Sequence, residues 1–126
     1  MVMRWVVGCL IALACAFWAV AIVASPASAQ VSLSIYRSAV KEGISESNKT
    51  YVTGLGRGVL WANVAAEDNG IKLFCPPAQT NFDPAFLASL LDQEIREPLS
   101  GVPWKDDTPI ELIMVYAFVD KFPCKK

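Results

Sequence analysis

An uninterrupted run of 20 apolar or small residues, spanning residues 5–24, most constrains what this chain can fold into. It follows a short start with one positive charge, and the small residues Ala27 and Ala29 stand shortly after it. Small residues two positions apart at the end of an apolar run form the A-x-A cleavage site of a secretory signal peptide. The pattern predicts that residues 1–29 are a leader, removed after Ala29, so that the mature chain begins at Gln30.

The same run could instead remain as a membrane anchor, because about 20 helical residues cross a hydrocarbon core of about 30 Å. We favour cleavage, since the small residues stand where a signal peptidase acts. Removing 29 of the 126 residues leaves 97, enough for one domain over residues 30–126. The domain is expected in the periplasm, with membrane contact only through an uncleaved leader.

Composition narrows the function of this domain. The chain has no histidine, which removes the Ser-His-Asp and Cys-His nucleophile systems and the commonest zinc ligand. Without the leader, ten basic and twelve acidic residues give a charge of −2, whereas nucleic-acid binders normally carry a basic excess. Asp92, Glu94 and Glu97 lie too close together on one helix to flank a sugar as an acid pair. We predict no catalytic residue, no metal or other cofactor and no nucleic-acid partner.

Two cysteines, Cys75 and Cys124, remain once Cys9 and Cys15 leave with the leader. In an oxidising compartment an even pair normally forms a disulfide. Closing a loop of about 50 residues stabilises a domain by about 4 kcal/mol in the chain-entropy model. We predict a Cys75–Cys124 disulfide; the alternatives are two buried thiols, or a metal pair that would lack half of its ligands.

The segment after residue 82 carries a complete set of helix signals. Asp83 is placed as N-cap, Pro84 at the first helical position, and Pro98 as the end. Apolar residues recur at steps of three and four, namely Phe86, Leu87, Leu90, Leu91 and Ile95. The opposite side, predicted to be solvated, carries Ser89, Asp92, Gln93, Arg96 and Glu97.

A last helix is predicted through Lys121, where Pro123 stops it. Thr108 as N-cap, Pro109 at the first position and Glu111 at the third would form a capping box. The helix is apolar on most of its surface, which predicts burial on more than one side and a central place in the fold.

Two further helices are predicted upstream, a short one over Ser32–Val40 and a longer one over about Ser47–Ala65. Gly54 and Gly58 lie four residues apart on the longer helix and share one face. Such a face permits close approach of another helix. We interpret it as an internal packing contact or as the seam of a homodimer. Together the signals predict an all-α domain of three to four helices with one disulfide.

The order of these landmarks resembles the Rap/Tai family of periplasmic immunity proteins, which neutralise peptidoglycan amidase effectors delivered by type VI secretion. The landmarks, in chain order, are Tyr51, Val52, Gly54, Phe74, Cys75, Pro77, Thr80, Phe122, Pro123 and Cys124. The resemblance implies an all-helical fold, a disulfide between the two cysteine motifs, homodimerisation, and inhibition by occluding the active site of an amidase. The chain departs from the family pattern where Glu97-Pro98 stands in place of a His-Pro element.

The loop that follows this departure is the predicted partner-binding surface. It combines turn residues with Trp104, Lys105, Asp106 and Asp107. Tryptophan is enriched in binding hot spots. In the alternative interpretation Trp104 folds back onto the core, and the two aspartates favour the N-terminus of the last helix through its dipole. A small structural or chaperone-like periplasmic protein with no amidase partner is the alternative function.

Overall fold

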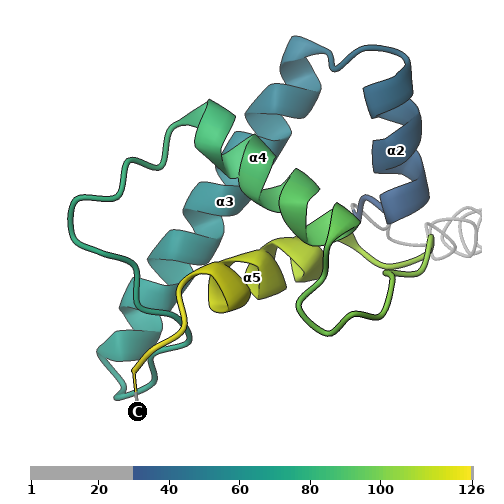
Figure 1. Ribbon diagram of the computed structural model, residues 1–126. Coiled ribbons are helices and arrows are strands. Elements are labelled where there is room, and N and C mark those ends of the chain that lie inside the picture. The colour runs from purple at the N-terminus through teal and green to yellow at the C-terminus, as the bar shows by residue number, and fades with distance from the viewer. Residues whose placement is uncertain (1–29, 126) are drawn as a thin grey trace, which may run out of the picture.

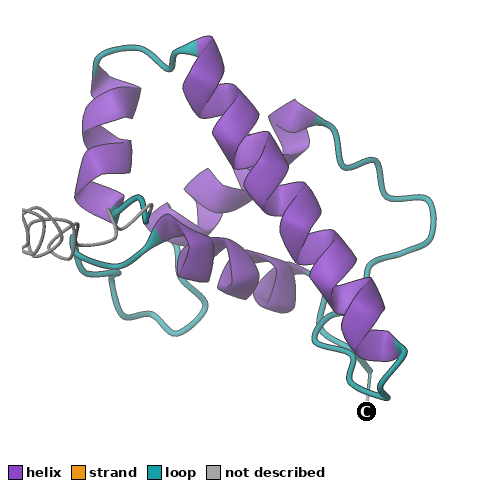
Figure 2. Cartoon of the chain, turned by 180° about the vertical axis from the view of Figure 1, so that it is seen from behind, coloured by secondary structure: helices purple, strands orange, loops and turns teal. Residues whose placement is uncertain are grey.

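The computed structural model describes residues 30–125, so the predicted leader lies outside the described residues. Figure 1 shows the helices, which are α2 (Leu33–Lys41), α3 (Glu46–Glu67), α4 (Pro84–Arg96) and α5 (Ile110–Lys121). Every regular element within residues 30–125 is a helix (Figure 2). An isolated β-bridge joins Ser32 and Pro109. The prediction of an all-α domain is confirmed.

Local signals start and end α4 as predicted. The Asp83 side chain accepts a hydrogen bond from the amide of Phe86 at 2.8 Å, and Pro84 occupies the first helical position of α4. The helix ends at Arg96, two residues before Pro98, because the residue preceding a proline is biased away from helical dihedral angles. These caps depend only on near neighbours in sequence, which is why the sequence predicts them.

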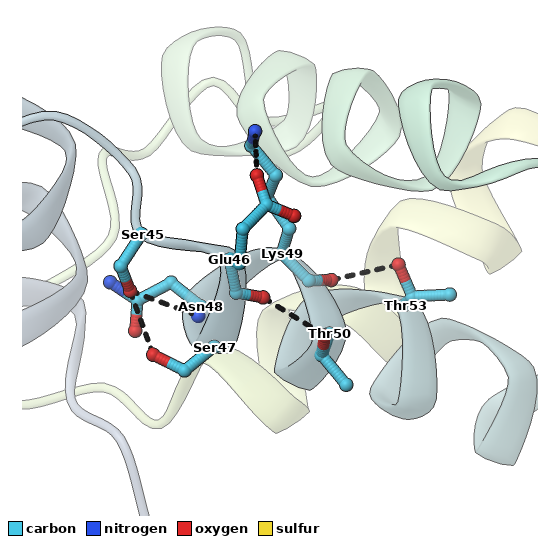
Figure 3. Close-up of polar contacts among 7 residues, drawn as sticks. All are labelled: Ser45, Glu46, Ser47, Asn48, Lys49, Thr50 and Thr53. Atoms are coloured by element: carbon cyan, nitrogen blue, oxygen red, sulfur yellow. Dashed lines mark hydrogen bonds and ion pairs between the residues drawn. The ribbon is translucent and has the colours of Figure 1, made fainter.

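The polar stretch before Tyr51 starts α3 (Figure 3). The Ser45 side chain accepts from the amide three residues on, at 3.3 Å. The hydroxyls of Thr50 and Thr53 donate to the carbonyls of Glu46 and Lys49 at 2.9 and 2.8 Å, and the Lys49 ammonium contacts the Glu46 carboxylate at 2.7 Å. Helix α3 therefore begins slightly earlier than predicted, at a side-chain cap.

The predicted capping box of α5 is wrong. The N-cap is Pro109, and no side chain caps the helix. The Thr108 carbonyl instead accepts the amide of Leu33 at 2.8 Å, and the first amide of α5 donates to the Val31 carbonyl at 2.9 Å. The Glu111 carboxylate accepts the Val31 amide at 3.2 Å. An N-terminal segment distant in sequence supplies the partners that a local box would have supplied.

Helix α5 occupies the centre of the fold, as its apolar surface predicts. It packs against both α3 and α4, which also pack against each other (Figure 1). The buried core comprises Leu33, Tyr36, Val52, Phe74, Leu87, Leu90, Leu91, Ile110, Ile113, Met114, Ala117 and Phe118. Five of these residues belong to α5.

The predicted disulfide is confirmed, with the Cys75 and Cys124 Cα atoms 4.9 Å apart. Beside it the Cys75 amide donates to the Phe122 carbonyl at 2.8 Å, and the Phe74 ring stacks on Phe118 with centroids 4.9 Å apart. The covalent bond thus fixes the end of α5 to the segment that follows α3.

A buried amide, Asn63, holds that same segment from the α3 side. Its Oδ1 accepts the amides of Leu73 and Phe74 at 2.8 and 3.3 Å, and its Nδ2 donates to the Phe74 carbonyl at 3.0 Å. Buried polar groups of this kind are stable only when hydrogen-bonded. Asn63 could not be identified from the sequence, since a single asparagine on a helix gives no signal of its partners.

The close approach expected at Gly54 and Gly58 occurs at Gly56 instead. A Cβ at Gly56 would lie 2.7 Å from the Cδ2 atom of Leu87 on α4, whereas a Cβ at Gly54 or Gly58 would meet nothing within 4 Å. The interpretation of the Gly54 and Gly58 face as an internal packing contact is therefore wrong. Both face outward, and a homodimer seam at this face stays a prediction.

Candidate functional site

The candidate site is built around the loop of residues 98–107, which connects α4 to α5 (Figure 1). A turn near its start is closed by the Gly101 amide, which donates to the Pro98 carbonyl at 2.8 Å. Gly101 has φ +69°, a left-handed conformation that favours glycine. The end of the loop is closed by the Thr108 amide, which donates to the Lys105 carbonyl at 3.0 Å.

Trp104 anchors the loop to the helical body. Its indole Nε1 donates to the Glu94 carboxylate on α4 at 3.2 Å, and its ring lies against Tyr116 on α5 with centroids 5.4 Å apart. The side chain is half-buried and packs against the core. The interpretation in which Trp104 folds back is therefore confirmed, and Trp104 is a positioning residue for the loop.

The three charged residues after Trp104 serve different purposes. The Asp106 carboxylate pairs with the Arg37 guanidinium on α2 at 2.5 Å, and its carbonyl accepts the Ser34 amide at 3.0 Å. The proposed dipole interaction with α5 is not the contact that Asp106 makes. Lys105 and Asp107 are exposed and have no side-chain hydrogen bond among the described residues. The structure thus leaves these two side chains accessible to a partner.

The most exposed apolar residues of the loop are Leu99 and Val102, on either side of the Gly101 turn. Their exposed fractions are 75% and 68%. Both belong to the loop predicted as the partner surface, but neither was singled out from the sequence, in which Trp104 was favoured because of its size. The sequence did contain a signal for their exposure. Two aliphatic residues flank a Ser-Gly turn, and residues at such a turn are not expected to be buried in the core.

A small cavity of about 120 Å³ adjoins the loop between α4 and α5. Its lining comprises Leu90, Gln93, Glu94, Glu97, Leu99, Ala117, Asp120 and Lys121. Glu94 is only 5% exposed, and burial raises the pKa of its carboxyl, with a further rise from the negative charge of Asp120. The hydrogen bond from Trp104 acts in the opposite direction on that pKa.

The proximity of Glu94 and Asp120 could not be predicted from the residue pattern of a single helix, because the two residues belong to different helices. The negative charge of Asp120 favours the protonated form of the Glu94 carboxyl. At about 120 Å³ the cavity is large enough to hold several water molecules. Among residues 30–125, no group of three or more potential metal-ligating side chains is placed to hold an ion.

Two tyrosines tie other helices together through carboxylates. The Tyr36 hydroxyl donates to Asp92 at 2.8 Å, and the Tyr51 hydroxyl donates to Glu111. Burial, followed by the hydrogen bond and charge of the neighbouring carboxylate, raises the pKa of Tyr36 strongly and that of Tyr51 to about 12. Asp92 was predicted on a solvated face; it instead connects α4 to α2.

The described fold is a small all-helical, disulfide-linked domain with an anchored loop that presents two apolar side chains. No described helix has the length and apolar character needed to cross a membrane. Comparisons of the chain with protein-family models, with curated proteins and with solved structures gave no match.

Proposed function

We propose that the chain is an exported binding protein whose loop at residues 98–107 contacts a protein partner. The observation that carries this proposal is the exposure of Leu99 and Val102 on a loop that Trp104 fixes to the helices. A pre-ordered loop loses little conformational entropy on binding. Covering an exposed aliphatic side chain contributes about 1.5–3 kcal/mol.

We further propose that the partner is a peptidoglycan amidase, inhibited by occlusion of its active site. The resemblance to the Rap/Tai landmarks supports this class. The cavity next to Leu99 adds a constraint, because it is lined by Glu94, Glu97 and Asp120 and by one basic residue, Lys121. A partner face that is apolar at its centre and basic beside it would complement this surface.

Co-purification with an exported amidase encoded beside this gene tests the proposal. The double variant Leu99→Ser with Val102→Ser should weaken binding at least about tenfold, since two covered side chains are lost. Ile71→Ser is the matched control, because Ile71 is similarly exposed, at 57%, on the loop that follows α3. Unchanged binding by the double variant, or equal weakening by the control, would reject this surface.

A structural or chaperone-like function is the second candidate. It is favoured by apolar side chains exposed outside the loop, above all Trp61 on α3, which is 72% exposed. Others are Val64 on α3 and Leu112 and Tyr116 on α5. Suppression of the aggregation of an unfolded protein, lost in Trp61→Ser, together with no amidase binding, would favour this function over inhibition.

A further inference from the structure

The Glu111 carboxylate on α5 holds the first residues of the described chain. Its Oε1 accepts the Val31 amide at 3.2 Å and also the Tyr51 hydroxyl from α3. Its Oε2 is buried and has no hydrogen-bond partner among residues 30–125. Buried polar atoms of folded proteins are nearly always hydrogen-bonded, so this oxygen needs a donor.

The segment that contacts this carboxylate through Oε1 is fixed in place. The Val31 carbonyl accepts the first amide of α5 at 2.9 Å, and the amides of Leu33 and Ser34 donate to Thr108 and Asp106 at 2.8 and 3.0 Å. Gln30 immediately precedes Val31, the residue whose amide contacts the carboxylate. Consecutive Cα atoms are about 3.8 Å apart, so the Gln30 backbone nitrogen is a donor that could reach Oε2 through rotation about the dihedral angles of Gln30 alone.

We propose that the α-ammonium group of Gln30, created when the leader is removed, binds the Glu111 carboxylate and donates to its Oε2. The proposal rests on the processing that the proposed function includes. Hydrolysis of the bond after Ala29 consumes one water, leaves a carboxylate on the leader and gives Gln30 an amine that takes up a proton. In the unprocessed chain the same nitrogen is an uncharged amide with a single hydrogen. Processing thus supplies the positive charge and the additional donors.

The nearby ionisable side chains have other contacts, so they do not supply the donor that Oε2 of Glu111 lacks. Tyr51 on α3 donates a neutral hydroxyl to the carboxylate, and burial with the adjacent charge of Glu111 raises its pKa to about 12. Arg37 on α2 is paired with Asp106 at 2.5 Å. An α-amine has an ordinary pKa of about 7.7–8.0, and binding to a carboxylate raises it. The stabilisation is therefore complete below that ordinary pKa and is lost as the pH rises through the raised value.

The test uses the chain exported from its full gene, with its first residue identified by mass spectrometry. Acetylation near pH 6.5 modifies the α-amine selectively, since lysine amines have a much higher pKa of about 10.4. We expect the acetylated protein to melt about 4–8 °C lower at pH 6, and the difference to disappear above about pH 10. Glu111→Gln is the control; it retains a neutral acceptor, so acetylation should hardly change its melting temperature.

The outcomes distinguish the cleavage of the leader from the pairing of Gln30 with Glu111. A chain that retains the leader, or starts at another residue, overturns the processing step and the pairing together. A chain that starts at Gln30 but whose melting temperature is insensitive to acetylation overturns the pairing alone. An equal loss on acetylating Glu111→Gln also overturns it, because the effect would then not depend on the carboxylate. Amidase binding is measured separately and is not decided by these results.

Discussion

At the scale of single residues, Glu94 illustrates a compromise between anchoring and charge. Its carboxylate accepts the Trp104 indole hydrogen bond that holds the loop, yet it is buried beside Asp120. The raised pKa means that the folded state binds the Glu94 proton more tightly than the unfolded state. Glu94 therefore favours folding below its ordinary pKa, and this contribution is lost as the pH rises, leaving a cost at neutral pH.

Replacing Glu94 by glutamine should remove that cost. Glu94→Gln retains an acceptor for Trp104 and eliminates the charge next to Asp120, so we expect its melting temperature to rise by a few degrees at pH 7. The gain should shrink as the pH falls through the titration of Glu94. Thermal melts from pH 4 to 8 measure it. Glu97→Gln is the control, because Glu97 is an exposed carboxylate on the same cavity, and its melting temperature should stay near that of the wild type. A lower melting temperature for Glu94→Gln would contradict this account.

At the scale of the helices, α3 has two kinds of glycine. Gly56 packs against the fully buried Leu87 side chain on α4, whereas Gly54 and Gly58 face outward. Glycine in a helix interior is less favourable than alanine by about 1 kcal/mol. Each glycine therefore weakens α3, but only Gly56 has an internal packing contact that compensates.

Alanine substitutions should separate these cases. Gly58→Ala should raise the free energy of unfolding by about 0.5–1 kcal/mol, because it adds helix propensity in open space. Gly56→Ala should lower it by about 1 kcal/mol, because overpacking against Leu87 costs about 1–3 kcal/mol and exceeds the propensity gain. Urea unfolding curves provide the measurement. Equal effects at both sites would refute the assignment.

The homodimer interpretation of the outward face has its own test. If Gly54 and Gly58 form a seam, Gly58→Leu should lower the mass measured by light scattering, because the larger side chain prevents close helix approach. An unchanged mass would remove the seam from consideration.

At the scale of the whole molecule, the disulfide carries a large share of the stability. Cys75 and Cys124 are 49 residues apart in sequence, and a loop of that length is worth about 4 kcal/mol in the chain-entropy model. Reduction should therefore lower the melting temperature by about 15 °C or more. The double variant Cys75→Ser with Cys124→Ser should melt low with or without reductant. A reduced wild type as stable as the oxidised form would contradict this estimate.

Interactions between residues close together in the sequence could be predicted, whereas non-covalent contacts between distant segments could not. Asp83 caps α4 through a neighbour three residues away, and the disulfide followed from the even number of cysteines in the expected compartment. Thr108 failed as a cap because its carbonyl is bonded to Leu33, far away in the chain. The pairing of Glu94 with Asp120 depends on how α4 lies against α5, which local patterns do not specify.

The disulfide at the C-terminal end of α5 also determines how the protein is best handled. Cys124 joins this end to the segment after α3, whereas the loop at residues 98–107 precedes the opposite end of the same helix. Twelve helical residues separate these ends by about 18 Å. The start of the loop nevertheless lies beside the disulfide end, because Leu99 lines one cavity with Asp120 and Lys121. A bulky group attached next to Cys124 would therefore obstruct the proposed partner surface, so partner capture is best measured with the protein free in solution.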